Sequence, residues 1–176
     1  MAKRIMRAPS DWFKTERVVD IYSVSGDMSD DFADYIEFWK HNGYWFFDSP
    51  QAIVDLARDK SIDLDGTKLF FYEVYEFEFD EGQWNEFRPE PSFKTDVLVP
   101  VQKSLEGFDV VTFTARTSAE HSPLSCNGLA SEIETNAHCL LASAERAKEL
   151  LEAGAFKDGE PGPHRIFAVY SVPEWS

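Results

Sequence analysis

The chain has 176 residues, of which 43% are hydrophobic and 15% aromatic, and its formal net charge is −15. This length suits a single globular domain, and the apolar content is enough for a hydrophobic core, which excludes a chain that is disordered throughout. The strong negative charge disfavours direct binding to nucleic acid, because the phosphate backbone carries charge of the same sign.

The cysteine content and the N-terminus indicate the compartment. Two cysteines are too few for a disulfide scaffold of this size, so we expect free thiols in a reducing cytoplasm. The first 16 residues are locally basic but lack an apolar run, which argues against a signal peptide. No stretch approaches about 18 uninterrupted apolar residues, so we expect no membrane association.

The first half of the chain predicts alternating strands and helices. The basic N-terminal segment is expected either to pack back through Trp12 and Phe13 or to fray. β-branched and aromatic residues favour strands, apolar spacing of three and four favours helices, and Ser49-Pro50 is typical of a helix start. The expected elements are a strand at Val18–Ser25, a helix at Asp31–His41, a short strand at Tyr44–Phe47, a helix at Gln51–Lys60 and a strand at Leu69–Phe79.

The second half follows similar rules, with a loop-rich stretch at 118–134. The expected elements are an edge strand at Val97–Val101, strands at Phe108–Ala115 and Asn136–Leu141, a helix at Ala144–Ala153 and a closing strand at Arg165–Val172. Together these elements predict an α+β fold, with a mixed or mainly antiparallel sheet of five to seven strands and two or three helices.

The two halves, residues 18–80 and 108–172, share an order of elements. Asn42 and Asn136, Ser49 and Ser143, and Leu56 and Leu150 each lie 94 residues apart. An internal duplication would explain this spacing and would give two pseudo-symmetric strand–helix–strand halves within one domain. The alternative is that the two halves acquired the same order of strands and helices independently, because few of their residues are identical.

The loop from His121 to Asn127 concentrates chemically useful side chains. Cys126 could act as a nucleophile if His121 or His138 served as its base and Asn127 oriented the imidazole. The spacing of histidine and cysteine here does not match a zinc finger or ribbon, and we expect no metal and no cofactor. The structural alternative is a turn in which Cys126 is a small buried apolar side chain.

Acidic residues lie on and beside the clearest predicted strand, at Glu76, Glu78, Asp80 and Glu81. We refer to residues 76–81 as the acidic ridge. Together with Tyr44, Trp45 and Trp84, which are residue types favoured at interfaces, this ridge could bind a partner of opposite charge. An exposed strand also carries such charges simply to remain soluble.

The sequence therefore favours a non-enzymatic, acidic binding protein that neutralises or regulates a basic protein partner, in the manner of bacterial or phage immunity proteins. Two alternatives stay open. One is a small cysteine-dependent hydrolase or transferase that uses the His121–Asn127 loop. The other is a small-ligand-binding module with a cleft between the two halves.

Overall fold

The computed structural model describes residues 2–8, 11–25, 32, 46–88, 97–113 and 121–173. It confirms the α+β fold with a mainly antiparallel sheet. Four strands lie side by side in the order β1 (Ala2–Arg4), β4 (Thr67–Asp80), β7 (His164–Val172) and β6 (Ser104–Thr112). β5 (Gln83–Glu86) pairs with the end of β4, and β2 (Met6–Arg7) pairs separately with β3 (Asp20–Ile21).

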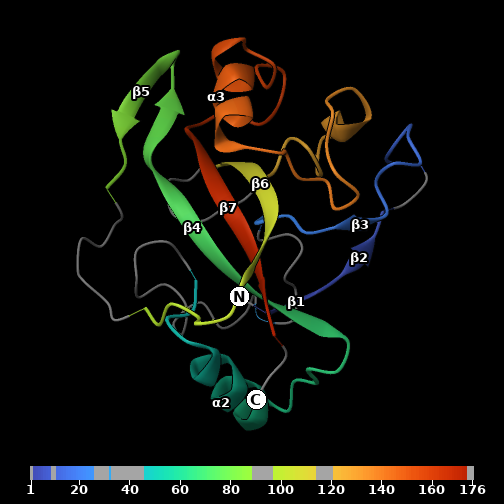
Figure 1. Ribbon diagram of the computed structural model, residues 1–176, viewed down its shortest axis with the longest axis vertical. Helices are drawn as coiled ribbons and strands as arrows, with labels where there is room; N and C mark the ends of the chain where they lie inside the picture. Colours follow the sequence, from blue (N-terminus) through green and yellow to red (C-terminus); the bar gives the residue numbers. More distant parts are fainter. Residues whose placement is uncertain are drawn as a thin grey trace.

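The antiparallel pair of β4 and β7 forms the centre of the sheet, and both halves of the chain contribute strands to it (Figure 1). In β4 the acidic residues Glu73 and Glu76 are exposed, but the pairing with β7 is irregular between Val74 and Glu78, and there Phe77 is 38% exposed. Phe70, Phe167 and Val169 are almost fully buried, and they pack with Val111 and Phe113 in one core cluster. This burial of large side chains fixes the register of the two strands.

The helices α2 (Pro50–Lys60) and α3 (Ala144–Glu152) lie at opposite ends of the molecule (Figure 1). Each begins with a serine cap, since Ser49 Oγ accepts from the Ala52 amide at 3.2 Å and Ser143 Oγ accepts from the Arg146 amide at 3.1 Å. The helices predicted at Gln51–Lys60 and Ala144–Ala153 are thus confirmed. The two caps agree with the spacing that suggested a duplication, although the duplication itself stays a prediction.

Several expected strands are corrected by the structure. Residues 97–101 and 136–140 form no strand, and the backbone of Leu141 makes only an isolated bridge to Phe108. Within Val18–Ser25 only Asp20–Ile21 is a strand, and residues 46–47 form none. The strand expected at Phe108–Ala115 instead runs from Ser104 to Thr112. Of the helix expected at Asp31–His41, all but Phe32 lies outside the described residues.

The N-terminal segment is anchored to the sheet. Its β1 strand pairs with the start of β4, and Ala2 is buried beside α2. Phe13 packs into the main core as expected, whereas Trp12 remains 45% exposed. The basic residues of this segment therefore belong to the fold, and one of them, Lys3, is buried.

Candidate functional site

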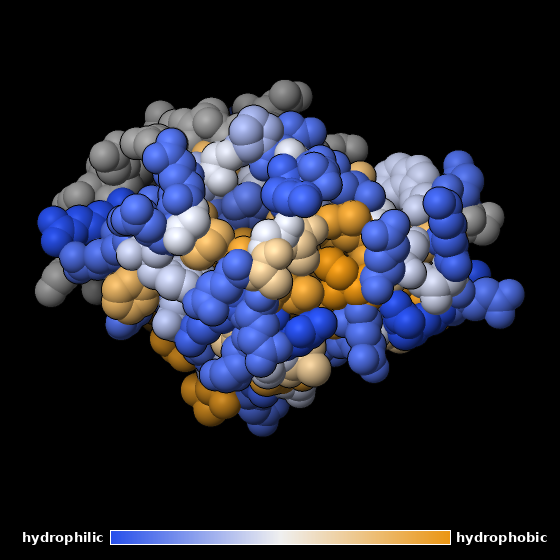
Figure 2. All heavy atoms as spheres, turned by 90° about the horizontal axis from the view of Figure 1, so that it is seen from above, coloured by the Kyte–Doolittle hydropathy of each residue, from blue (hydrophilic) through white to orange (hydrophobic). Residues whose placement is uncertain are grey.

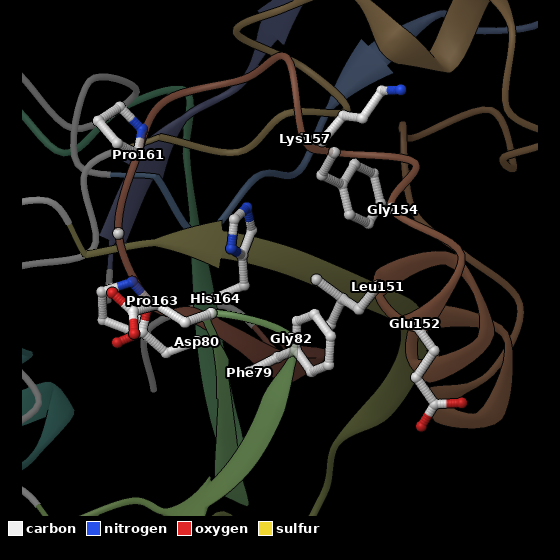
Figure 3. Close-up of a pocket in the computed structure, with 13 residues that line it drawn as sticks. Phe79, Asp80, Gly82, Leu151, Glu152, Gly154, Lys157, Pro161, Pro163 and His164 are labelled. Carbon is white, nitrogen blue, oxygen red and sulfur yellow. The ribbon is translucent and has the colours of Figure 1, made fainter.

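A hollow of about 740 Å³ lies at the end of the molecule that carries α3. Its walls are residues 79–82 at the end of β4, the last turn of α3 at 151–152, and parts of the loop 154–164 (Figure 3). Apolar lining comes from Phe79, Leu151 and Phe156. This volume is in the range of sites that hold a small molecule or a peptide segment.

The β4–β5 hairpin forms one wall of the hollow, and its turn is tight. Asp80 pairs with Gln83, so only Glu81 and Gly82 form the turn, and both have positive φ, at 48° and 79°. Two-residue turns of this kind match the twist of the flanking strands. Trp84 then donates its indole N–H to Glu152 Oε1 at 2.8 Å, which joins the hairpin to the end of α3.

His164 opens β7 and lines the hollow (Figure 3). Its ring lies parallel to that of Phe156 with centroids 6.1 Å apart, and it hydrogen-bonds to the backbone of Gly162. Its Nε2 atom is buried and has no hydrogen-bond partner among the described residues. Burial lowers the pKa of the imidazole, while the Gly162 bond and the charge of Asp80 oppose that shift. Burial therefore favours the neutral form of His164, whose Nε2 atom is enclosed by its surroundings.

The lowered pKa of His164 predicts a loss of stability in mild acid. Because the unfolded chain binds this proton more tightly than the native protein, the free energy of unfolding is highest above the unfolded pKa of about 6.5 and falls as the pH drops towards the native pKa. Urea unfolding of the wild type and of His164→Gln from about pH 7.5 to about pH 5 checks this. The wild type should lose more stability than the variant across this range, and parallel curves would contradict the assignment.

Polar side chains around the hollow are mostly hydrogen-bond acceptors. The carboxylates of Asp80 and Glu152 lie on opposite sides of the His164 ring, and Glu81 is exposed at the turn (Figure 3). Lys157 is the one cationic side chain in the lining, and its ammonium group points away from the imidazole (Figure 3). Seen from this end, an apolar area is ringed by hydrophilic side chains (Figure 2).

The structure separates the predicted ridge residues. Glu76 and Glu81 are exposed, and Asp80 contributes to the wall of the hollow. Glu78 is held by Arg165, whose Nε and Nη2 atoms donate to Glu78 Oε2 at 3.0 and 2.9 Å. The guanidinium carbon of Arg165 also lies 3.6 and 3.8 Å from the ring centroids of Phe87 and Phe113. Tyr44 and Trp45, which were predicted as contact residues, lie outside the described residues.

The predicted cysteine site has a different environment. Cys126 Sγ contacts the hydroxyl oxygens of Ser25 and Ser125 at 3.7 and 3.8 Å. His138 stacks on Tyr22 with centroids 3.9 Å apart. The two hydroxyl groups beside this thiol are not bases, and the roles suggested for Cys126, His121 and Asn127 stay predictions.

Thiol labelling distinguishes the two cysteines. Cys139 is 2% exposed, and burial raises its pKa well above the usual value, so the thiolate is suppressed. Cys126 is only partly buried. We expect an alkylating reagent at about pH 8 to modify Cys126 in the native protein and Cys139 only after unfolding. Fast native labelling of Cys139 would contradict this packing.

A buried carboxylate that the sequence analysis missed lies on β6. Asp109 is fully buried, and Ser23 Oγ and Ser122 Oγ donate to it at 3.0 and 2.6 Å. The backbone amides of Val24 and Val110 donate to its two oxygens at 2.8 and 2.9 Å. Burial raises the pKa of Asp109, and these donors together with the charge of Lys3 oppose that shift.

Lys3 completes this buried cluster from the N-terminal strand. It is 3% exposed, and its Nζ donates to the carbonyl oxygens of Ser23 and Ser25 at 2.5 and 2.7 Å. Ser23 therefore links the lysine to Asp109, since its carbonyl accepts from one and its hydroxyl donates to the other. The cluster joins β1, the 18–25 segment, β6 and the 121–127 loop, so its role is to hold the fold together.

Within the described ranges, no group of three or more His, Cys, Asp or Glu side chains is placed to hold a metal ion, and no helix there has the length and apolar character to cross a membrane. The comparisons with known proteins assign no role to these residues, so the site is interpreted from its own geometry. No protein-family model, no curated protein and no solved structure matches this chain.

Proposed function

We propose that this protein is a non-enzymatic binding protein whose hollow between the β4–β5 hairpin and α3 receives a segment of a basic protein partner. The observation that carries the proposal is the pairing of an apolar floor with carboxylates at its edge, namely Asp80, Glu81 and Glu152. A cationic peptide segment has both the charge and the aliphatic stems that such a lining complements.

The net charge of −15 also supports a basic partner, because it accelerates encounter with a positively charged protein. Trp84 supports it further, since tryptophan is favoured at interfaces and its hydrogen bond to Glu152 holds the edge of the hollow in place. Residues from both halves of the sequence line the hollow. The alternative of a small-ligand-binding cleft between the two halves therefore stays open.

Selection from random peptides displayed on phage tests the proposal, because such a selection requires no identified partner. We expect the wild-type protein to select sequences enriched in lysine or arginine together with apolar residues. Their affinity should fall roughly tenfold between about 50 mM and about 500 mM NaCl, because exposed charges are screened. Selected peptides without basic residues, or an affinity that salt does not change, would overturn the proposal.

A further inference from the structure

The segment that precedes β6 lies outside the regular structure. Residues 97–103 form no helix or strand and lead directly into β6 (Figure 1). Leu98 and Val99 are each 63% exposed, and Val101 is fully exposed. A backbone outside regular structure whose side chains are mostly exposed opens at a low cost in free energy. We propose that residues 97–103 are a strap that can leave the sheet, and that the positive charge of Lys103 is the latch that holds it closed.

The latch is a cage of two aromatic rings and a carboxylate around Lys103. Its Nζ atom lies 4.6 Å from the ring centroid of Phe71 and 4.1 Å from that of Tyr170, and these two residues are cross-strand partners on β4 and β7. The same Nζ donates to Glu73 Oε1, and Tyr170 donates its hydroxyl to Glu73 Oε2 at 3.0 Å. Aromatic faces and a carboxylate both stabilise an ammonium group, so the cage holds Lys103 through its charge.

Lys103 is well enclosed, in contrast to the exposed side chains that precede it in the strap. Its side chain is only 22% exposed. Its hydrogen bond to Glu73 is also the largest cause of the lowered pKa of that carboxyl group. Any change that removes the positive charge of Lys103 should therefore favour the open strap.

The strap covers a small cavity of about 40 Å³. Val97, Leu98 and Pro100 close it from the strap side. The other apolar walls come from α2 and from the strands β4 and β7, through Ile53, Leu69, Phe71 and Val172. Release of Lys103 would uncover the rings of the cage and open this cavity to solvent. The strap therefore controls access to this part of the sheet, independently of the hollow at the α3 end.

Hydrogen exchange of the Leu98 amide tests the proposal, because this N–H donates to the Asp48 carbonyl oxygen at 3.2 Å when the strap is closed. Its exchange rate follows the population of the open strap. The reference is the Phe108 amide in β6, which donates to the Leu141 carbonyl oxygen at 3.0 Å. Lys103→Met keeps much of the aliphatic stem but removes the charge. We expect it to raise the exchange rate of the Leu98 amide at least roughly fivefold and to leave that of the Phe108 amide within about twofold.

Two further variants serve as controls. Lys148→Met removes a lysine whose Nζ also lies over an aromatic ring, 4.3 Å from the centroid of Tyr75, but from α3, and it should leave Leu98 exchange within about twofold of the wild type. Lys103→Arg retains the charge and should keep the exchange slow. Unchanged exchange in Lys103→Met, or equally fast exchange in Lys103→Arg, would overturn the proposal. Faster exchange of both amides in Lys103→Met would mean a general loss of stability and would also overturn it.

Discussion

Replacement of Asp109 by asparagine is expected to lower the free energy of unfolding by about 1–3 kcal/mol, the usual cost of leaving a buried hydrogen-bonding group unsatisfied. Each carboxylate oxygen accepts a backbone amide, from Val24 and from Val110. Asparagine has one oxygen, so its NH₂ group would face one of these donors. The variant also removes the negative charge of Asp109, which interacts electrostatically with Lys3. Urea unfolding followed by far-UV circular dichroism measures the loss.

A double-mutant cycle keeps this prediction testable if the single variant folds poorly. Lys3→Met removes the buried cation and preserves much of the aliphatic stem. We expect the combination with Asp109→Asn to cost less than the sum of the single changes by at least about 1 kcal/mol, because the two charges depend on each other. Additive losses would show that Asp109 acts only through its neutral hydrogen bonds.

Replacement of Gly107 by alanine is expected to lower the free energy of unfolding by roughly 2–5 kcal/mol. Gly107 sits at an irregularity in the pairing of β6 with β7, and its φ of +148° is rarely adopted by other residues. A Cβ atom there would lie 2.8 Å from Leu140 Cβ and 2.9 Å from the Leu141 carbonyl oxygen. Both neighbours are fully buried, so they have little freedom to move.

Gly66 provides the matched control for this change. Its φ is +76°, but a Cβ atom added there meets nothing within 4 Å. Gly66→Ala should therefore show only the backbone cost of about 1–2 kcal/mol. The difference between the two alanine variants measures the steric conflict behind β6, and equal losses would contradict the close packing at Gly107.

The elements with a clear periodicity were predictable from the sequence. β4 was evident from its alternating residues, and α2 and α3 from their serine caps and apolar spacing. The prediction of a strand at Asn136–Leu141 was wrong, because apolar residues that indicate burial were taken to indicate a strand. Leu140 and Leu141 are fully buried, yet Asn136 folds this segment into a turn by accepting from the amides of His138 and Leu140.

Long-range effects account for the other errors. Residues 97–101 have the composition of a strand, but no described strand pairs with them and Val101 is fully exposed. Asp109 and Lys3 lie far apart in the sequence, and no local pattern indicated that they share a buried cluster. An aspartate within the apolar FDVVTF run was the one available signal.

The candidate site was predicted in part. The ridge residues Asp80 and Glu81 and the nearby Trp84 were identified from charge and aromatic character, and they lie at the hollow or at its edge. His164 and Glu152 were missed because they follow more than 65 residues later and meet the hairpin only through the pairing of β4 with β7 and the position of α3. The closing strand was predicted to begin at Arg165, whereas β7 begins at His164.

The most direct test of the proposed function compares one selected basic peptide on two charge-matched triple variants. The first, Asp80→Asn/Glu81→Gln/Glu152→Gln, neutralises the edge of the hollow and retains an oxygen acceptor for Trp84. The second, Asp59→Asn/Asp63→Asn/Asp65→Asn, neutralises three exposed carboxylates in and after α2, at the opposite end. Isothermal titration calorimetry should show at least roughly tenfold weaker binding to the first variant and an affinity within about twofold of the wild type for the second. Equal weakening of both would mean that net charge alone attracts the peptide and that the hollow is not the binding site.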